Sequence, residues 1–180
     1  MAIQTTPSIG IDRPGTSDTV GTVVARAGLN CEEFGSNGIV RKTVFTLTNV
    51  VLTFTDAGST GYASQQIYDF PAGVILILGT VQDLAWSAIG GSAGNLIASV
   101  GTTATADATL STTEINICPA SSASATNGDS QSTAVAFLNG ATTAIDAFLN
   151  IGSSGDPGTG ATVTVNGTIE MTWINLGDNV

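Results

Sequence analysis

The C-terminal segment from Thr162 to Ile174 alternates between apolar and polar residues almost without interruption. A β-strand turns successive side chains to opposite faces, so a period of two gathers the apolar residues on one face. The apolar residues fall on odd positions and are Val163, Val165, Ile169, Met171 and Trp173. We therefore predict a long strand with one buried and one solvated face, which directs the chain towards a β-sheet architecture.

The segment 43–56 alternates as well, but its parity changes part of the way along. Phe45 and Leu47 lie at odd positions, whereas Val50 and Leu52 lie at even ones. A slip of one residue would turn half of the apolar set away from the core. A β-bulge or a tight turn must absorb this change, and the sequence leaves both open.

Other segments also have the character of strands. Residues 19–25 are rich in β-branched side chains and should form a first strand. The apolar run from Val74 to Leu78 lies between two glycines and predicts a strand covered on both faces. Residues 141–150 fit a strand or a short amphipathic helix, and we favour the strand. The small polar residues of 119–133 predict a loop.

The composition argues against helices. Charged residues make up 10% of the chain, and Lys42 is its single lysine. Exposed helix faces usually draw on Lys and Glu, so we expect little helix. Roughly eight short strands with Gly-rich turns and no internal repeat predict an all-β fold. Its architecture should be a two-layer antiparallel β-sandwich, with a jelly roll favoured.

The chain divides into an arm and one domain. Residues 1–18 carry Pro7, Gly10, Pro14 and Gly15 and show no regular hydrophobic period, so we predict an extended N-terminal arm. Ordering such an arm costs backbone entropy, which contact with its own domain or a neighbour must offset. Residues 19–180 are long enough to bury one core and should form a single β-sandwich domain.

The charge balance restricts the partners. Fourteen acidic residues against four basic ones give a net charge of −10, so we expect no direct nucleic-acid binding. No apolar run approaches the ~20 residues that span a bilayer, and we expect no membrane partner. The first residues lack a basic and an apolar region of a secretory signal, which predicts synthesis in the cytoplasm.

The chain contains no histidine, which removes Ser-His-Asp and Cys-His catalysis and the His-based metal sites. We therefore predict that it is not an enzyme and needs no cofactor or metal. Gly128-Asp129-Ser130 is similar to the nucleophile block of one lipase class but lacks the histidine partner. Paired carboxylates of a glycosidase would have to come from Asp69, Asp83, Asp107, Glu114 and Glu170.

Two weaker features have structural explanations. Asp56 or Asp156 could hold calcium together with backbone carbonyls, but neither lies in a regular calcium-loop pattern. Cys31 and Cys118 are too few for a disulfide framework. We interpret them as ordinary thiols, and a disulfide between them is the alternative that sequence alone leaves open.

Three stretches resemble small virion structural proteins of tailed bacteriophages. They are IYDFPAGVILILG (67–79), SVGTTATADATLSTTEINICPA (99–120) and TVNGTIEMTWINLGD (164–178). The resemblance implies a capsid decoration or cement protein that sits on the capsid exterior of the virion. It would contact the major capsid protein, often as a homotrimer, after synthesis in the host cytoplasm.

The candidate contact residues follow from the sequence pattern, because the resemblance includes no motif that would locate them. Ile9, Ile11, Arg13 and Pro14 in the arm are candidate capsid or subunit contacts, because apolar residues in a loose segment suit docking. Trp86 is a further candidate, with the core as its other possible place. The alternative function is a tail, baseplate or head-fibre adhesin that binds host surface glycans. An enzyme and a cellular β-sandwich module are further alternatives.

Overall fold

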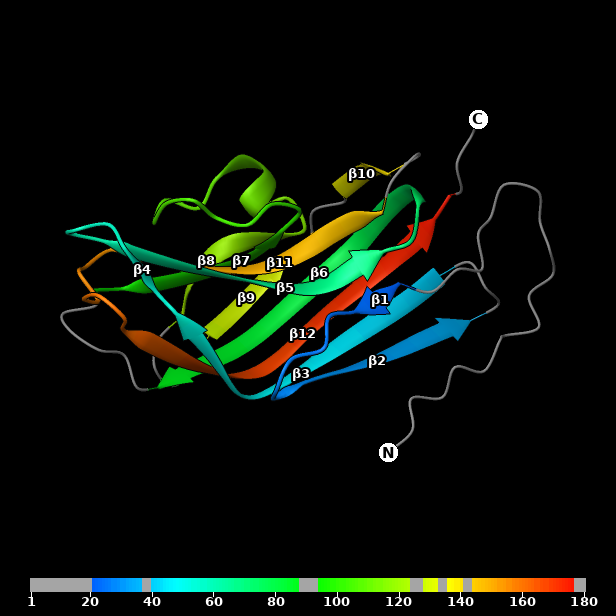
Figure 1. Cartoon of the computed structure of the whole chain (residues 1–180). Coiled ribbons are helices and arrows are strands. Elements are labelled where there is room, and N and C mark those ends of the chain that lie inside the picture. Colours follow the sequence, from blue (N-terminus) through cyan, green and yellow to red (C-terminus); the bar gives the residue numbers. More distant parts are fainter. Residues whose placement is uncertain are drawn as a thin grey trace.

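Two antiparallel β-sheets packed face to face form the body of the protein (Figure 1). In this computed structural model, residues 21–36, 40–87, 94–123, 128–132, 136–140 and 144–176 are described. The all-β sandwich predicted from the sequence is confirmed. Within the described ranges the helical element is a short 3₁₀ turn, η1 (Thr112–Glu114).

Sheet A has the strand order β1-β5-β11-β7-β8, and β4 also pairs with β5. Its strands are β1 (Thr22–Val23), β4 (Thr55–Asp56), β5 (Gly61–Phe70), β7 (Leu96–Gly101), β8 (Cys118–Ala123) and β11 (Ile145–Ser153). Sheet B has the order β10-β6-β12-β3-β2, and β9 also pairs with β6. Its strands are β2 (Leu29–Ser36), β3 (Val40–Thr53), β6 (Gly73–Ser87), β9 (Gly128–Ser132), β10 (Ala136–Gly140) and β12 (Thr162–Asn175).

The pairing of the main strands runs from the outside of the sequence inwards. Strand β3 pairs with β12, β5 with β11, β6 with β9 and β10, and β7 with β8. Two successive pairs of these main strands stay within one sheet, β7 and β8 in sheet A and β9 and β10 in sheet B, and the other successive strands lie in opposite sheets. The strand pairs are therefore nested along the sequence, with β7–β8 as the innermost pair.

The inner face of β12 supplies the centre of the core. All five apolar residues predicted to face inward on this strand are fully buried, which confirms the period-two prediction. Trp173 meets Phe70 edge to face, with 5.3 Å between ring centroids, and Tyr68 meets Phe45 in the same way at 5.6 Å. Such pairs add about 0.5–1.5 kcal/mol beyond the burial of their area.

A β-bulge absorbs the change of parity in β3. Val50 pairs with Val165 and Leu47 with Gly167, so two residues of β3 face one of β12. Asn49 occupies the bulge with φ 54°, and its N–H donates a hydrogen bond of 2.8 Å to Asn166 Oδ1. The bulge alternative is therefore correct, and both halves of β3 turn their apolar residues towards the core.

Three segment predictions need correction. Strand β6 is fully buried on its inner face at Ile75 and Ile77, whereas on its outer side, as far as the described residues show, Val74 and Leu76 are half-buried and Leu78 is 38% exposed. The predicted loop 119–133 contains most of β8 and all of β9, which pair with β7 and β6. Within the described residues 21–25 the first strand comprises Thr22–Val23 and ends before Val24. Residues 141–150 contain most of β11, so the favoured strand interpretation is confirmed.

The segment 102–117 covers part of the outer face of sheet A (Figure 1). Asn150 of β11 is fully buried and holds this segment through its side-chain amide. Its Nδ2 donates to the carbonyls of Thr103 and Glu114 at 3.0 Å, and its Oδ1 accepts from the N–H of Thr105. The amide thus replaces the backbone hydrogen bonds that an irregular segment lacks.

Gly167 gives a direct test of the register between β12 and β6. It has φ 127°, and a Cβ at this position would overlap the carbonyl oxygen of Asp83. We expect Gly167→Ala to lower the free energy of unfolding by roughly 2–4 kcal/mol, combining backbone strain and overpacking. Urea titration followed by tryptophan fluorescence measures this loss. The control Gly79→Ala, where a Cβ meets open space, should change it by less than about 0.5 kcal/mol.

Candidate interaction surface

The acidic side chains proposed for metal binding serve local turns. Asp56 Oδ1 accepts a hydrogen bond from the N–H of Gly58, and its Oδ2 accepts one from Thr159 Oγ1. These bonds hold the pKa of Asp56 below its ordinary value, the backbone bond contributing most. Asp156 closes a second turn by accepting from Gly158. Over the residues that the structure describes, no three His, Cys, Asp or Glu side chains gather as a metal site would require.

Three of the five carboxylates considered for glycoside hydrolysis, Glu170, Glu114 and Asp107, also have structural partners. Glu170 forms an ion pair with Lys42 at 2.7 Å. Glu114 accepts from the N–H groups of Ser111 and Ala106, and Asp107 accepts from that of Thr109, so both stabilise the segment 102–117.

Asp69 differs from these acids because one of its oxygens is poorly satisfied. It lies opposite Asp146 across β5 and β11, and its Oδ1 is buried without a hydrogen-bond partner. Burial, followed by the charge of Asp146, raises the pKa of Asp69 above its ordinary value. Asp146 is itself engaged by Gln66 Nε2 at 2.7 Å. The pair is therefore a point of electrostatic strain on sheet A.

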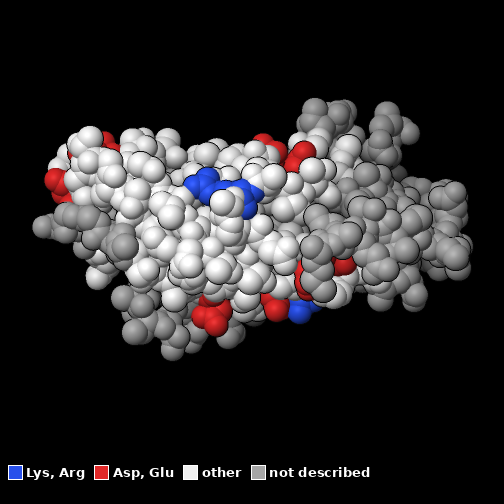
Figure 2. Space-filling model, turned by 60° about the horizontal axis from the view of Figure 1, so that its bottom comes forward, with Lys and Arg blue, Asp and Glu red and all other residues white. Residues whose placement is uncertain are grey.

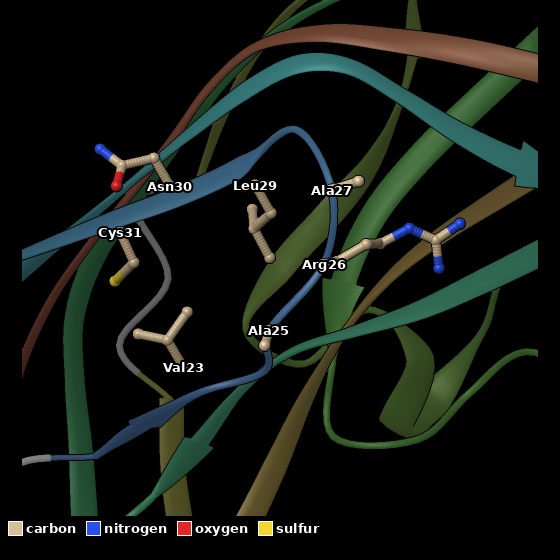
Figure 3. A pocket seen from close by; sticks show the side chains of 7 residues that line it. All are labelled: Val23, Ala25, Arg26, Ala27, Leu29, Asn30 and Cys31. Atoms are coloured by element: carbon tan, nitrogen blue, oxygen red, sulfur yellow. The ribbon is translucent and has the colours of Figure 1, made fainter.

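A groove of about 470 Å³ lies where the chain crosses from β1 to β2 (Figure 3). The side chains of Val23, Leu29 and Cys31 face the space between the two strands, while those of Arg26 and Asn30 point away from it. Burial raises the pKa of the Cys31 thiol to about 12, helped by the charges of Glu33 and Glu32. The thiol therefore stays protonated, so the groove has no activated nucleophile at this position.

A buried polar cluster joins the two sheets beside this groove. Arg41 forms an ion pair with Glu33 at 2.9 Å, and Tyr68 donates to the other oxygen of Glu33 at 2.7 Å. The N–H of Gly21 donates to the Tyr68 hydroxyl, and the Arg41 guanidinium lies over the ring of Trp173. Burial, followed by the charge of Glu33, raises the pKa of Tyr68 above its ordinary value. The cluster ties β2 and β3 to β5.

The clearest surface feature is an apolar area on the outer face of sheet B, which we name the sheet B patch. It comprises Val40, Val74, Leu76, Leu78, Ile174 and Leu176. Val40, Ile174 and Leu76 form one row across β3, β12 and β6 by register. All six side chains are half-buried or exposed, and Leu176 is 40% exposed.

The patch contrasts with the usual outer face of an antiparallel sheet, which is polar. Its six members include no charged residue, and Phe34 on the neighbouring strand β2 is 53% exposed. On the face shown in Figure 2, the few charged side chains are separated by wide areas without charge. Large apolar areas on a protein surface often mark interaction sites, which makes the sheet B patch the candidate site on this molecule.

The structure describes one of the residues predicted as contacts, Trp86, and not the others. Ile9, Ile11, Arg13 and Pro14 lie outside the described residues, as does the whole arm 1–18, so these assignments stay predictions. Trp86 is 4% exposed and belongs to the core, which leaves little of its ring for a partner. The sheet B patch was not predicted from the sequence, although the apolar run of residues 74–78 supplies three of its six members.

Both cysteines are buried reduced thiols. The described part of the chain includes no helix with the length and apolar character that crossing a bilayer requires. In the comparisons with known proteins, no family model, no curated protein and no solved structure matches this chain.

Alkylation tests whether the Cys31 thiol in the groove is unreactive. With its pKa at about 12, Cys31 would be thiolate in roughly one molecule in 10⁴ at pH 8. We expect iodoacetamide to leave Cys31 unmodified in the native protein and to alkylate it after unfolding in urea, as read by peptide mass spectrometry. Rapid native labelling of Cys31 would contradict the inert thiol.

The Asp69–Asp146 pair predicts a dependence of stability on pH. The folded-state pKa of Asp69 is raised, so the folded chain holds this proton more tightly than the unfolded chain. Its stability therefore falls as pH rises from the unfolded pKa near 4 through the folded pKa. We expect Asp69→Asn to raise the urea midpoint at pH 7 and to leave it unchanged at about pH 3, where Asp69 is protonated in both states. An equal effect at both pH values would contradict this cause.

Proposed function

We propose that the chain is a virion structural protein of a tailed bacteriophage, a capsid decoration or cement protein on the head exterior. The observation that carries the proposal is the sheet B patch, an apolar face with a clear use in binding another protein surface. A shell repeats each contact by symmetry, so a modest affinity per contact is multiplied over the particle. The major capsid protein is the partner.

We further propose that the sandwich is a jelly roll. In that topology a long hairpin of eight strands rolls into two sheets, so the first strand pairs with the last and the pairing proceeds inwards. The order β3–β12, β5–β11, β6–β9/β10 and β7–β8 supports this assignment. Jelly rolls occur in viral capsid and lectin domains, which is a likeness of fold and supports the virion role by analogy alone.

A structural role fits the chemistry of the polar side chains. The chain has no histidine, and the pKa of Cys31 keeps its thiol protonated. Glu33, Arg41 and Asn150 are engaged in contacts that join or cover the sheets. These observations support a protein that works by packing and not by turnover.

The same observations favour decoration over glycan binding. An adhesin for sugars usually presents aromatic rings at its surface, against which sugar rings stack. Of the large apolar residues that the structure describes as exposed, Phe34 alone is aromatic, and the others are Val51, Leu78, Val81 and Leu176. This surface suits an aliphatic protein contact better.

Electron cryo-microscopy of particles made by the phage that encodes this chain tests the function. We expect density for a two-sheet sandwich at symmetry-related positions on the head. Particles from a phage with an early stop codon in this gene are the matched control, and they should lack that density and release DNA at a lower temperature. Density confined to the tail, or identical heads in both preparations, would reject the decoration role.

A further inference from the structure

Strand β1 is short and joins the predicted N-terminal arm to the sandwich. It comprises two residues (Thr22–Val23) at the edge of sheet A, where it pairs with β5. Just before it, the N–H of Gly21 donates to the Tyr68 hydroxyl at 3.1 Å. Just after it, the N–H of Val24 donates to the carbonyl of Ile67 at 3.5 Å. Short edge elements of this kind open at a lower free energy than core strands, without unfolding of the whole domain.

The outer face of sheet A places two carboxylates next to β1. Asp69 of β5 lies in register with Thr22 of β1 on one side and with Asp146 of β11 on the other. Its Oδ1 is buried and has no hydrogen-bond partner, whereas Asp146 accepts from Gln66 Nε2 at 2.7 Å. An ionised oxygen without a donor or water is costly inside a protein, and a second negative charge beside it adds to the cost.

The charged groups around Asp69 come from one neighbouring strand. Asp146 is the charge that acts on Asp69 among the residues that the structure describes, and β1 contributes no charged side chain at its two positions. Burial, followed by the charge of Asp146, raises the pKa of Asp69 above its ordinary value. The ion pair of Glu33 with Arg41 contacts Tyr68, whose side chain lies on the opposite face of β5 from that of Asp69.

The two strands beside Asp69 differ in how firmly they are held. Strand β11 has nine residues and pairs with β5 on one side and with β7 on the other. Strand β1 has two residues and is paired along one side, with β5. An ionised Asp69 gains water for its buried oxygen only when a neighbouring element moves aside. Because moving β11 would break both of its pairings, β1 is the element that yields.

We propose that β1 is a pH-dependent latch at the root of the N-terminal arm, which docks on β5 when Asp69 is protonated and opens more readily when Asp69 and Asp146 are both ionised. The docked state holds the proton more tightly than the open state, so docking weakens as pH rises from about 4. Opening frees the backbone of residues 21–25, and five residues at ~3.3–3.6 Å each add about 17 Å to the reach of the arm. The latch is a property of the chain alone and does not depend on the virion role.

Amide hydrogen exchange, followed by NMR on the full chain, tests the latch. The amides of Gly21 and Val24 are the probes, because their hydrogen bonds to β5 break when β1 opens. We expect Asp69→Asn to slow their exchange at least about threefold at pH 7 and to leave it unchanged at about pH 3, where Asp69 is protonated in both states. Wild type and variant are compared at the same pH, so the intrinsic exchange rates cancel, as does any protonation of Glu33.

The matched control is Asp83→Asn. Asp83 is exposed on the outer side of β6 in sheet B, and its replacement removes one negative charge just as Asp69→Asn does. We expect this variant to exchange at Gly21 and Val24 as the wild type does at both pH values. Equal slowing by the two variants would make the effect one of net charge and would overturn the latch.

A second variant opens the latch by a different route. A Cβ at Gly21 would overlap the ring of Tyr68, which is fully buried, so Gly21→Ala should undock β1 at every pH. In this background Asp69→Asn should no longer slow the exchange of Val24, because the two changes act on the same opening. Circular dichroism confirms that each variant keeps its strands.

The urea titration separates the latch from a general loss of stability. If Asp69→Asn raises the urea midpoint at pH 7 but leaves the exchange of Gly21 and Val24 unchanged, the carboxylate pair is relieved by some other motion and the latch is wrong. Full retention of the Asp69→Asn effect on Val24 in the Gly21→Ala background would also overturn it.

Discussion

The register between β3 and β12 is the constraint on which the sandwich depends. Both strands are long, and β12 lies between β3 and β6 in the middle of sheet B. With strict alternation along β3, one half of its apolar residues would point to solvent. The bulge at Asn49, fixed by its hydrogen bond to Asn166, keeps Phe45 and Leu52 on the same side. The aromatic contacts around Trp173 form only when the strands pair in this register.

Much of the fold could be predicted where the hydrophobic pattern of a single strand reflects which of its faces is buried. The alternation in β12 reflects a core below and solvent above, and the slip in β3 reflects the bulge. The apolar run 74–78 was ambiguous, because a strand covered on both faces and a strand with an apolar exposed face have the same sequence. Strands β8 and β9 were missed because Ser-rich and Ala-rich segments have little β preference of their own. Pairing with the edges of β7 and β6 makes them strands.

The surface features could not be predicted from the sequence because they combine distant residues. The sheet B patch joins β3, β6 and β12, and it exists only once the register places Val40, Ile174 and Leu76 in one row. The Glu33–Arg41–Tyr68 cluster likewise joins three strands from both sheets. The absence of histidine-dependent chemistry, in contrast, follows from composition alone, because the chain contains no imidazole.

The outside-to-inside pairing of the strands has a consequence for synthesis. Strands β3 and β6 are both made long before β12, which lies between them in the sheet. Ribosomes add about 5–20 residues per second, so the nascent chain spends several seconds with the central position of sheet B vacant. Its aromatic and aliphatic inner surface is then a substrate for chaperones. Chains cut short by premature termination would stay in that state and be open to removal by proteases.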